Sequence, residues 1–368
     1  MKVLFTTNFP SMYRVDFFNE LGKHCDLTVA YERRHAAHRN KKWLGTDAEN
    51  FCAVNLDMRR FRRSQSIGFG IVNIIRQQPF DFIVFSGYSS PSVIFAVLYC
   101  QLKKIPYYFE YDGGFDEHDN PVIAHLKKRL LLPAAGHFIT CKELEQYLKG
   151  IGVSDERLIR YPFSSVREAQ MALQPPTDAE REHLRAQLGI AEEKVVLTVG
   201  QFIHRKGLDV LLKAAASLDS STGIYFIGGK PTEDYLVLID EGQLQHIHFI
   251  EFISHDELND WYRACDVFVL PTRYDIWGLV INEAMANGIP IISTSRCVAA
   301  TELISDGVNG YIVKPDEPEL LAERIQSVLS NEAAATEMGR QGLERIRPFS
   351  IEGMAKAHYA FFEEHFTR

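Results

Sequence analysis

Several common signatures are missing from this chain of 368 residues. Its six cysteines are scattered, and no two stand at C-x-x-C spacing, so we expect reduced thiols in a cytosolic protein. The longest apolar run, PSVIFAVLYCQL, is too short to span a bilayer, and the opening MKVLFTTNFPSMYR lacks the layout of a signal peptide. We therefore expect a cytoplasmic protein, with contact at a membrane surface left open.

Two nucleotide-binding motifs are also missing. A dinucleotide oxidoreductase should carry G-x-G-x-x-G after its first strand, but TTNFPSMYR contains no glycine. The stretch VGQFIHRKG has the wrong spacing and also fails the P-loop pattern. No G-x-S-x-G motif or Cys/His pair offers a nucleophile. These absences argue against several large enzyme classes.

Charge is unevenly distributed along the chain. Residues 1–165 hold 22 Lys and Arg against 17 Asp and Glu, whereas the rest holds 18 against 31. Much of the basic excess lies in ERRHAAHRNKKW and DMRRFRRS, which could be solvated loops or could meet an anionic partner. A nucleic acid fits poorly, because these stretches lack interleaved aromatic residues and the whole chain is acidic.

Both halves alternate short apolar strands with helical segments. The expected strands are KVLFTT, DLTVAY, DFIVFSG, PYYFEY and HFITC, then KVVLTVG, GIYFIGG, HIHFIEF, DVFVLP, PIISTS and GYIVKP. Such alternation predicts parallel sheets covered on both faces. The pattern breaks at QPPTDAEREHLRAQLGIAEEK, which predicts a linker holding a helix capped by Thr177. We expect two doubly wound α/β domains, with ligands at the carboxyl ends of the strands in the cleft between them.

Two strand-end loops in the second half carry polar residues. LTVGQFIHRKGLDVLL ends a strand at Gly200 and places Arg205 and Lys206 before a helix, which suits a diphosphate or is a solvated pair in a turn. DVFVLPTRYDIWGLVINEAMANGIP predicts a helix from Gly278, with Glu283 one turn inside it. Glu283 could bind ribose hydroxyls or face solvent.

In these loops the sequence resembles the retaining glycosyltransferases of family 4, which have the GT-B fold. Their signature is Glu, seven residues, Glu, followed by EAMA-G-P, and here it reads DIWGLVINEAMANGIP. VGQFIHRKGLDVLLKA resembles the pyrophosphate loop of the family, and ELISDGVNGYIVKP resembles a further family stretch. The resemblance covers nearly all of the second half, and reaches the first half through the weaker EYDGGF.

The resemblance implies two Rossmann-like domains facing each other across a cleft. It implies an acceptor-binding domain of residues 1–165 with the terminal helix 350–368, and a nucleotide-sugar domain of residues 166–349. No metal and no cofactor are expected, because the nucleotide-sugar is a co-substrate.

The family pattern also implies roles for individual residues. The expected catalytic residues are Asp112, Arg205, Lys206 and Asp275, with Asp275 on the sugar hydroxyls. The expected donor-binding residues are Gly200, Gln201, Arg205, Lys206, Phe252, Ile253, Trp277, Gly278, Leu279 and Glu283.

Two residues depart from the family pattern. Gln201 stands where many members have Arg, so Arg205 is expected to stabilise the leaving diphosphate instead. Asp275 replaces the first Glu and is one methylene shorter, which could shift the sugar or its identity.

The first half is harder to interpret. NPVIAHLKKRLLL is a basic amphipathic segment that could meet an anionic bilayer, or be half-buried with its lysine heads in water. Arg33, Arg34, Lys41, Lys42 and Arg59–Arg63 add charge, and Arg14 could meet an acceptor phosphate. The cluster YDGGFDEHD favours a mobile loop over a metal site.

The resulting prediction is a retaining glycosyltransferase that moves a sugar from a UDP- or GDP-sugar to a glycan or lipid-linked acceptor. The setting would be surface polysaccharide or glycoconjugate biosynthesis, in the cytoplasm or at the inner face of the cytoplasmic membrane. A nucleotide-sugar epimerase and a catalytically weak sugar-nucleotide-binding protein remain as alternatives.

Overall fold

The computed structural model describes residues 1–33, 48–56, 59–62, 65–67, 69–114 and 121–366. The chain divides into two compact units. Unit 1 is Met1–Ser165 with Phe349–Arg368, and unit 2 is Val166–Pro348. Unit 1 is thus discontinuous in sequence, because its last helix follows the whole of unit 2.

A parallel sheet forms the centre of unit 1. Within the described residues it has seven strands in the order β3-β2-β1-β6-β7-β8-β9. The strands are β1 (Lys2–Thr7), β2 (Asp26–Tyr31), β3 (Cys52–Asn55), β6 (Phe82–Ser86), β7 (Tyr108–Glu110), β8 (Gly136–Ile139) and β9 (Leu158–Arg160). A separate antiparallel pair is formed by β4 (Arg59–Arg62) and β5 (Gln65–Ile67).

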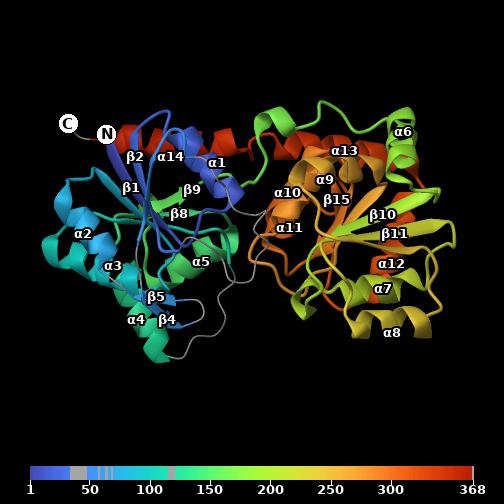
Figure 1. Ribbon diagram of the computed structural model, residues 1–368, viewed down its shortest axis with the longest axis horizontal. Helices are drawn as coiled ribbons and strands as arrows, with labels where there is room; N and C mark the ends of the chain where they lie inside the picture. Colours follow the sequence, from blue (N-terminus) through green and yellow to red (C-terminus); the bar gives the residue numbers. More distant parts are fainter. Residues whose placement is uncertain (34–47, 57–58, 63–64, 68, 115–120, 367–368) are drawn as a thin grey trace. The chain divides into compact units, whose positions relative to one another are not determined.

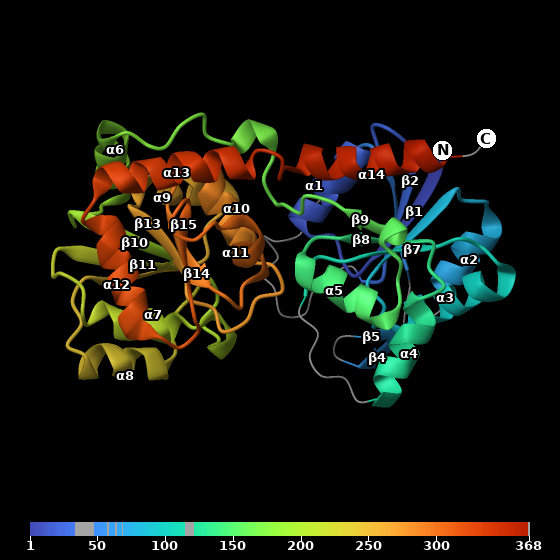
Figure 2. The same ribbon diagram turned by 180° about the vertical axis from the view of Figure 1, so that it is seen from behind.

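Helices cover both faces of this sheet (Figures 1 and 2). They are α1 (Met12–Leu21), α2 (Gly70–Gln77), α3 (Pro91–Lys103), α4 (Pro121–Leu131), α5 (Lys142–Ile151) and α14 (Ile351–His365). α1 and α14 lie side by side on one face, and α3 and α5 lie on the other. Phe5, Phe17, Phe138 and Phe362 are fully buried between the sheet and the α1–α14 pair. The terminal helix therefore completes the core of unit 1.

Unit 2 is also built on a parallel sheet. Its described residues form six strands in the order β12-β11-β10-β13-β14-β15. The strands are β10 (Lys194–Val199), β11 (Thr222–Ile227), β12 (Ile247–Ile250), β13 (Val267–Leu270), β14 (Ile291–Thr294) and β15 (Gly310–Val313). Every strand that the sequence predicts in either half is present, and both sheets are doubly wound.

Two helical layers sandwich the sheet of unit 2 (Figure 2). The helices are α6 (Asp178–Leu188), α7 (Leu208–Ala215), α8 (Glu233–Glu241), α9 (His255–Ala264), α10 (Leu279–Ala286), α11 (Val298–Leu303), α12 (Pro318–Leu329) and α13 (Glu332–Ile346). α7, α8 and α12 lie on one face, and α9, α10 and α13 lie on the other. Their lengths run from 6 residues in α11 to 15 residues in α13.

The segment predicted as a linker is part of the body of unit 2. Thr177 caps α6 as expected, since its hydroxyl accepts a hydrogen bond from Glu180 N at 3.3 Å. Arg263 Nε on α9 then binds Glu180 Oε1 at 2.5 Å. Arg185 binds Asp266 at 2.8 Å before β13. These contacts fasten α6 to the unit, so the linker interpretation of this segment is wrong.

Candidate donor site at the switch point of unit 2

The strand order reverses direction between β10 and β13 in unit 2. Loops that leave the carboxyl ends of two such strands run to opposite faces of the sheet and leave a crevice between them, where ligands of doubly wound folds bind. The two loops that the sequence singled out are the ones that follow β10 and β13. The topology therefore brings together residues that are about seventy positions apart in sequence.

The two loops are in direct contact at Gly207. Its φ is 63°, and a Cβ there would lie 2.1 Å from the carbonyl oxygen of Pro271, so a side chain is excluded on both grounds. Arg273 N and the Thr272 hydroxyl both donate to the carbonyl oxygen of Arg205, at 2.9 and 2.8 Å. These bonds fix the short 3₁₀ turn His204–Lys206 beside the second loop.

Lys206 and Arg205 both face Asp275. Lys206 Nζ lies 2.5 Å from Asp275 Oδ2, and Arg205 Nη1 lies 3.1 Å from Asp275 Oδ1. The Asp275 side chain is 7% exposed and that of Lys206 14%, whereas that of Arg205 is 41% exposed. The structure thus brings these three predicted site residues together, as two cations on one carboxylate.

The start of α10 is shaped by a left-handed glycine. Gly278 has φ 102°, and a Cβ there would lie 2.7 Å from the sulfur of Cys297. Burial raises the pKa of the Cys297 thiol to about 12, and the nearby Asp275 carboxylate adds to the effect. Trp277 is buried, and its indole N–H donates to Asn282 Oδ1 at 2.8 Å. Helix α10 therefore begins at Leu279, directly after a tightly packed turn in which Gly278 carries no side chain.

Glu283 is buried one turn into α10, which excludes the solvent-facing alternative. The Tyr262 hydroxyl on α9 donates to Glu283 Oε2 at 3.0 Å. Burial raises the pKa of Tyr262 well above its ordinary value, and Glu283 raises it further. The phenol thus remains a donor, and it orients the carboxylate. Tyr262 was not expected from the sequence, because nothing in HDELNDWYRAC distinguishes it from an ordinary core residue.

The remaining predicted donor-binding residues lie on the same edge of the sheet. Gly200 directly follows β10, and Gln201 after it is exposed. Phe252 and Ile253 are half-buried in the loop between β12 and α9, two strands away from β10. The structure brings Gly200 next to the side chain of Lys206, since a Cβ at Gly200 would lie 3.7 Å from Lys206 Cδ.

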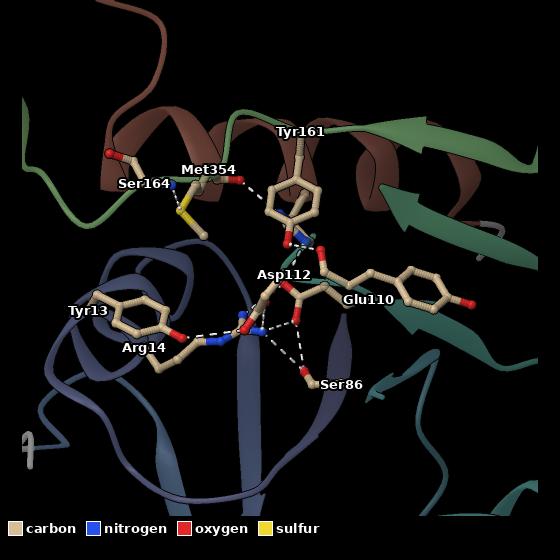
Figure 3. Close-up of polar contacts among 10 residues, drawn as sticks. Tyr13, Arg14, Ser86, Glu110, Asp112, Tyr161, Ser164 and Met354 are labelled. Atoms are coloured by element: carbon tan, nitrogen blue, oxygen red, sulfur yellow. Dashed lines mark hydrogen bonds and ion pairs between the residues drawn. The ribbon is translucent and has the colours of Figure 1, made fainter. Parts of the chain in front are cut away.

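Asp112 belongs to unit 1, just beyond the end of β7. Figure 3 shows the Arg14 guanidinium between Asp112 and Glu110, with Tyr13 and Ser86 beside them. Arg14 Nη2 binds Asp112 Oδ1 at 2.6 Å and Glu110 Oε2 at 2.7 Å, and Arg14 Nη1 binds Glu110 Oε1 at 2.9 Å. Arg14 is 2% exposed, whereas the Asp112 side chain is 32% exposed. Asp112 is therefore an accessible carboxylate that is ion-paired with the buried guanidinium of Arg14.

Arg14 is not placed to meet an acceptor phosphate, contrary to the sequence interpretation. Its guanidinium is buried and engaged by two carboxylates at the start of α1. Burial by itself would raise the pKa of Glu110, but Arg14 and His358 outweigh it and hold that pKa well below its ordinary value. His358 Nε2 on α14 lies 3.3 Å from Glu110 Oε1, and both side chains are fully buried.

The basic segment after Asn120 forms α4, and most of it is exposed. Only Leu130 and Leu131 are buried among the residues whose side chains are described, so the half-buried alternative fails for most of the helix. Ile123 is 50% and Leu126 48% exposed. Phe95, Leu98 and Leu102 on α3 are also exposed, and Phe69 stacks on Phe95 at 5.3 Å. We call Phe69, Phe95, Leu98, Leu102, Ile123 and Leu126 the apolar patch of unit 1.

Some of the residues singled out in the sequence lie outside the described part of the chain. These are Arg34, Lys41, Lys42, Arg63 and the acidic part of YDGGFDEHD, Asp116 to Asp119. Within the described part of the chain, no three His, Cys, Asp or Glu side chains gather as metal ligands. Nor does any helix of that part have the length and apolar character required to cross a membrane.

Comparison with known proteins identifies one domain in the second half of the chain. Residues 180–345 match the family model described as glycosyl transferases group 1. An uncharacterized glycosyltransferase of Methanocaldococcus jannaschii is 31% identical over 170 residues, which are 46% of this chain and 47% of that protein. A lipopolysaccharide core biosynthesis mannosyltransferase of Rhizobium meliloti is 28% identical over 204 residues, 52% of this chain and 57% of that protein. The chain thus spans about half the length of the curated relatives it matches.

Solved structures resemble the chain over its full length. Anabaena HepE in complex with UDP has a TM-score of 0.78 at 16% identity, covering 99% of this chain and 100% of that one. Such a low identity shows the fold, which is GT-B with two Rossmann-like domains. Residues 180–345 therefore form a glycosyl transferases group 1 domain, and the chain carries it on the GT-B fold of the family 4-like glycosyltransferases that its sequence resembles.

Proposed function

We propose that the protein is a retaining, metal-independent glycosyltransferase of the hexosyltransferase type. It would move a sugar from a UDP- or GDP-sugar to a glycan or lipid-linked acceptor, in surface polysaccharide or glycoconjugate biosynthesis. One observation carries the proposal: Lys206 and Arg205 both face Asp275 at the switch point of unit 2, and the helix that follows Asp275 carries the buried Glu283. In the proposed complex the diphosphate binds Lys206 and Arg205, and the ribose binds Glu283. The UDP bound to the similar fold of HepE supports it.

The chemistry of such a site needs no protein nucleophile. Sugar transfer with retention can proceed on one face of the donor, with the departing diphosphate taking the proton of the incoming hydroxyl. The protein would position both substrates and stabilise charge on the leaving group. Lys206 and Arg205 would supply that charge, and the amides at the start of α10 would add the positive end of a helix dipole. Asp112 of unit 1 is a further proposed catalytic residue.

Binding of UDP, GDP and a panel of their sugars, measured by calorimetric titration, tests the donor site. We expect one nucleotide to bind selectively, and Glu283→Ala to lose that binding because the ribose hydroxyls lose their acceptor. Glu283→Gln keeps a partner for Tyr262 and should weaken binding less. Glu323→Ala, at an exposed position of α12, is the matched control and should bind like the wild type. Failure of every nucleotide to bind would contradict the donor site itself.

The acceptor side of the proposal rests on the apolar patch of unit 1. The patch lies on α3, α4 and Phe69 before α2, and Lys103, Lys104, Lys128 and Arg129 on or next to α3 and α4 are exposed to solvent. Apolar side chains flanked by cations fit an anionic bilayer, where each Lys or Arg near the surface adds roughly 1 kcal/mol. The Rhizobium relative is a lipopolysaccharide core biosynthesis mannosyltransferase, which agrees with an acceptor held at such a surface.

Vesicle co-sedimentation checks the membrane contact. We expect the protein to sediment with phosphatidylglycerol-containing vesicles, and Leu126→Glu to reduce the bound fraction several-fold because it places a carboxylate against anionic lipid. Leu173→Glu is the matched control, since Leu173 is 92% exposed but belongs to unit 2. Equal loss in both variants, or no binding by the wild type, would remove the patch from the proposal.

A further inference from the structure

The main chain at Asp275 is anchored to the turn that follows β14. Asp275 N donates to the carbonyl oxygen of Arg296 at 3.0 Å, and Val298 N donates to the carbonyl oxygen of Asp275 at 3.3 Å. Asp275 also forms a parallel bridge with Cys297. Because the N–H and the carbonyl group of Asp275 are both hydrogen-bonded, its main chain is fixed at the edge of the sheet. The cations that pair with its carboxylate can change without moving that main chain.

Both oxygens of that carboxylate already have cationic partners. Lys206 Nζ binds Oδ2 and Arg205 Nη1 lies beside Oδ1, so two positive charges share one negative charge. The cations have the longer side chains, and Arg205 is the most exposed of the three, with its Nη1 also donating to the carbonyl oxygen of Tyr274 at 2.9 Å. A phosphate that arrives at this site must therefore draw the cations away from Asp275.

We propose that Asp275 is an internal counter-ion that exchanges partners when the donor binds, and so makes the site prefer a sugar nucleotide over a nucleoside diphosphate. On binding, Lys206 and Arg205 would turn to the diphosphate, and the released Asp275 oxygens would accept the sugar hydroxyls. This inference rests on the proposed function.

A nucleoside diphosphate without its sugar fits this arrangement poorly. Its phosphates would take the cations, but Asp275 would be left with no hydroxyl donors and with two anionic phosphates close by. The unfavourable charge is relieved only when a sugar is attached or when the diphosphate leaves. Asp275 would thus favour binding of the sugar nucleotide and release of the nucleoside diphosphate product. This electrostatic role is additional to its hydrogen bonds with the sugar hydroxyls.

Calorimetric titration of three probes into wild type and Asp275→Asn tests this exchange. The probes are inorganic pyrophosphate, UDP and UDP-glucose. Asn keeps the size of the side chain but removes the charge that opposes the phosphates. We expect Asp275→Asn to bind pyrophosphate and UDP at least ~10-fold more tightly, and UDP-glucose with little gain or some loss. The preference for UDP-glucose over UDP should therefore fall by about tenfold.

Two further variants make the result specific. Asp275→Glu keeps the charge and should keep the wild-type preference for the sugar nucleotide. Asp316→Asn is the matched control for loss of one negative charge in unit 2, because Asp316 is exposed and Asn tolerates its left-handed φ of 61°. Thermal melting of each variant establishes that it is folded.

The outcomes separate the inference from the proposed function. Weaker or unchanged binding of UDP and pyrophosphate by Asp275→Asn would contradict the proposed counter-ion role. Asp275 would then only hold Lys206 and Arg205 in place. If UDP and UDP-glucose do not bind the wild type here, and GDP and its sugars do not bind it in the titration of the nucleotide panel, the proposed function fails. In that case the pyrophosphate result alone still decides whether Asp275 competes with an anion for Lys206 and Arg205.

Discussion

Replacing Arg14 by methionine is expected to destabilise unit 1 by about 3–5 kcal/mol, a large share of the stability of an ordinary domain. The substitution leaves Glu110 fully buried with no strong cation, and it also removes the support of Asp112. The double variant Arg14→Met with Glu110→Gln should recover part of the loss, because the uncompensated charge is then gone. Urea denaturation followed by circular dichroism measures the change as a shift of one unfolding transition.

An exposed ion pair of the same unit provides the matched control. Arg160 on β9 binds Glu145 on α5 at 2.9 Å, with both side chains partly in solvent. Arg160→Met should cost at most about 1 kcal/mol, since exposed pairs contribute little. If Arg14→Met costs no more than Arg160→Met, burial of the charged cluster does not matter for stability.

The same cluster gives the stability of unit 1 a defined dependence on pH. The pKa of Glu110 lies well below its ordinary value of 4.5 in the folded protein, so the folded state binds this proton less readily than the unfolded chain. Its contribution is therefore complete above pH 4.5 and is lost as the pH falls below that value. In the double variant with Glu110→Gln, the acid decline of the unfolding free energy should be shallower than in the wild type.

Lys206→Ala should lower turnover by about 10²–10³. Lys206 is the less exposed of the two cations, packs along Gly200 and reaches Asp275, so it is placed to meet charge that develops on a leaving diphosphate. Folding stability should change little. The measurement is the rate of nucleoside diphosphate release from the nucleotide-sugar that binds the wild type.

Lys213→Ala is the control for this prediction. Lys213 lies on α7 of the same unit, is 51% exposed and makes only a 3.9 Å contact with Asp209. Its variant should turn over like the wild type. A rate for Lys206→Ala that matches the wild type would remove Lys206 from the site.

The two sheets could be predicted from the sequence because their strands are buried on both faces. Runs such as KVLFTT and DVFVLP read as continuous apolar segments, and they recur as β1 and β13. The edge strands β3 and β9 were not predicted, because CAVN and LIR are short and half-exposed. The helix α13 was missed because EAAATEMGRQGLERI is mostly polar, with only Met338, Leu343 and Ile346 as large apolar residues on its buried face.

The candidate site was only partly predictable. Spacing and family pattern pointed to Lys206, Asp275 and Glu283, because strand-end loops carry functional residues in doubly wound sheets. The partners of those residues depend on contacts between distant segments. Nothing in the sequence places the Tyr262 hydroxyl on Glu283, or the two cations on Asp275. Arg14 was misread because a lone arginine after a strand gives no sign that Glu110 and Asp112 will surround it.

The split of unit 1 around unit 2 has a consequence for the order of events during synthesis. Residues 166–348 form their sheet entirely from neighbouring segments, so unit 2 can fold as soon as it has emerged from the ribosome. Unit 1 must wait for α14, which supplies Phe362 and His358 to its core. At the usual ~5–20 residues per second, the delay is roughly ten to forty seconds. During that interval the α14 side of the aromatic core is open and, among the described helices, only α1 covers that face of the sheet, so the unit that is translated first is completed last.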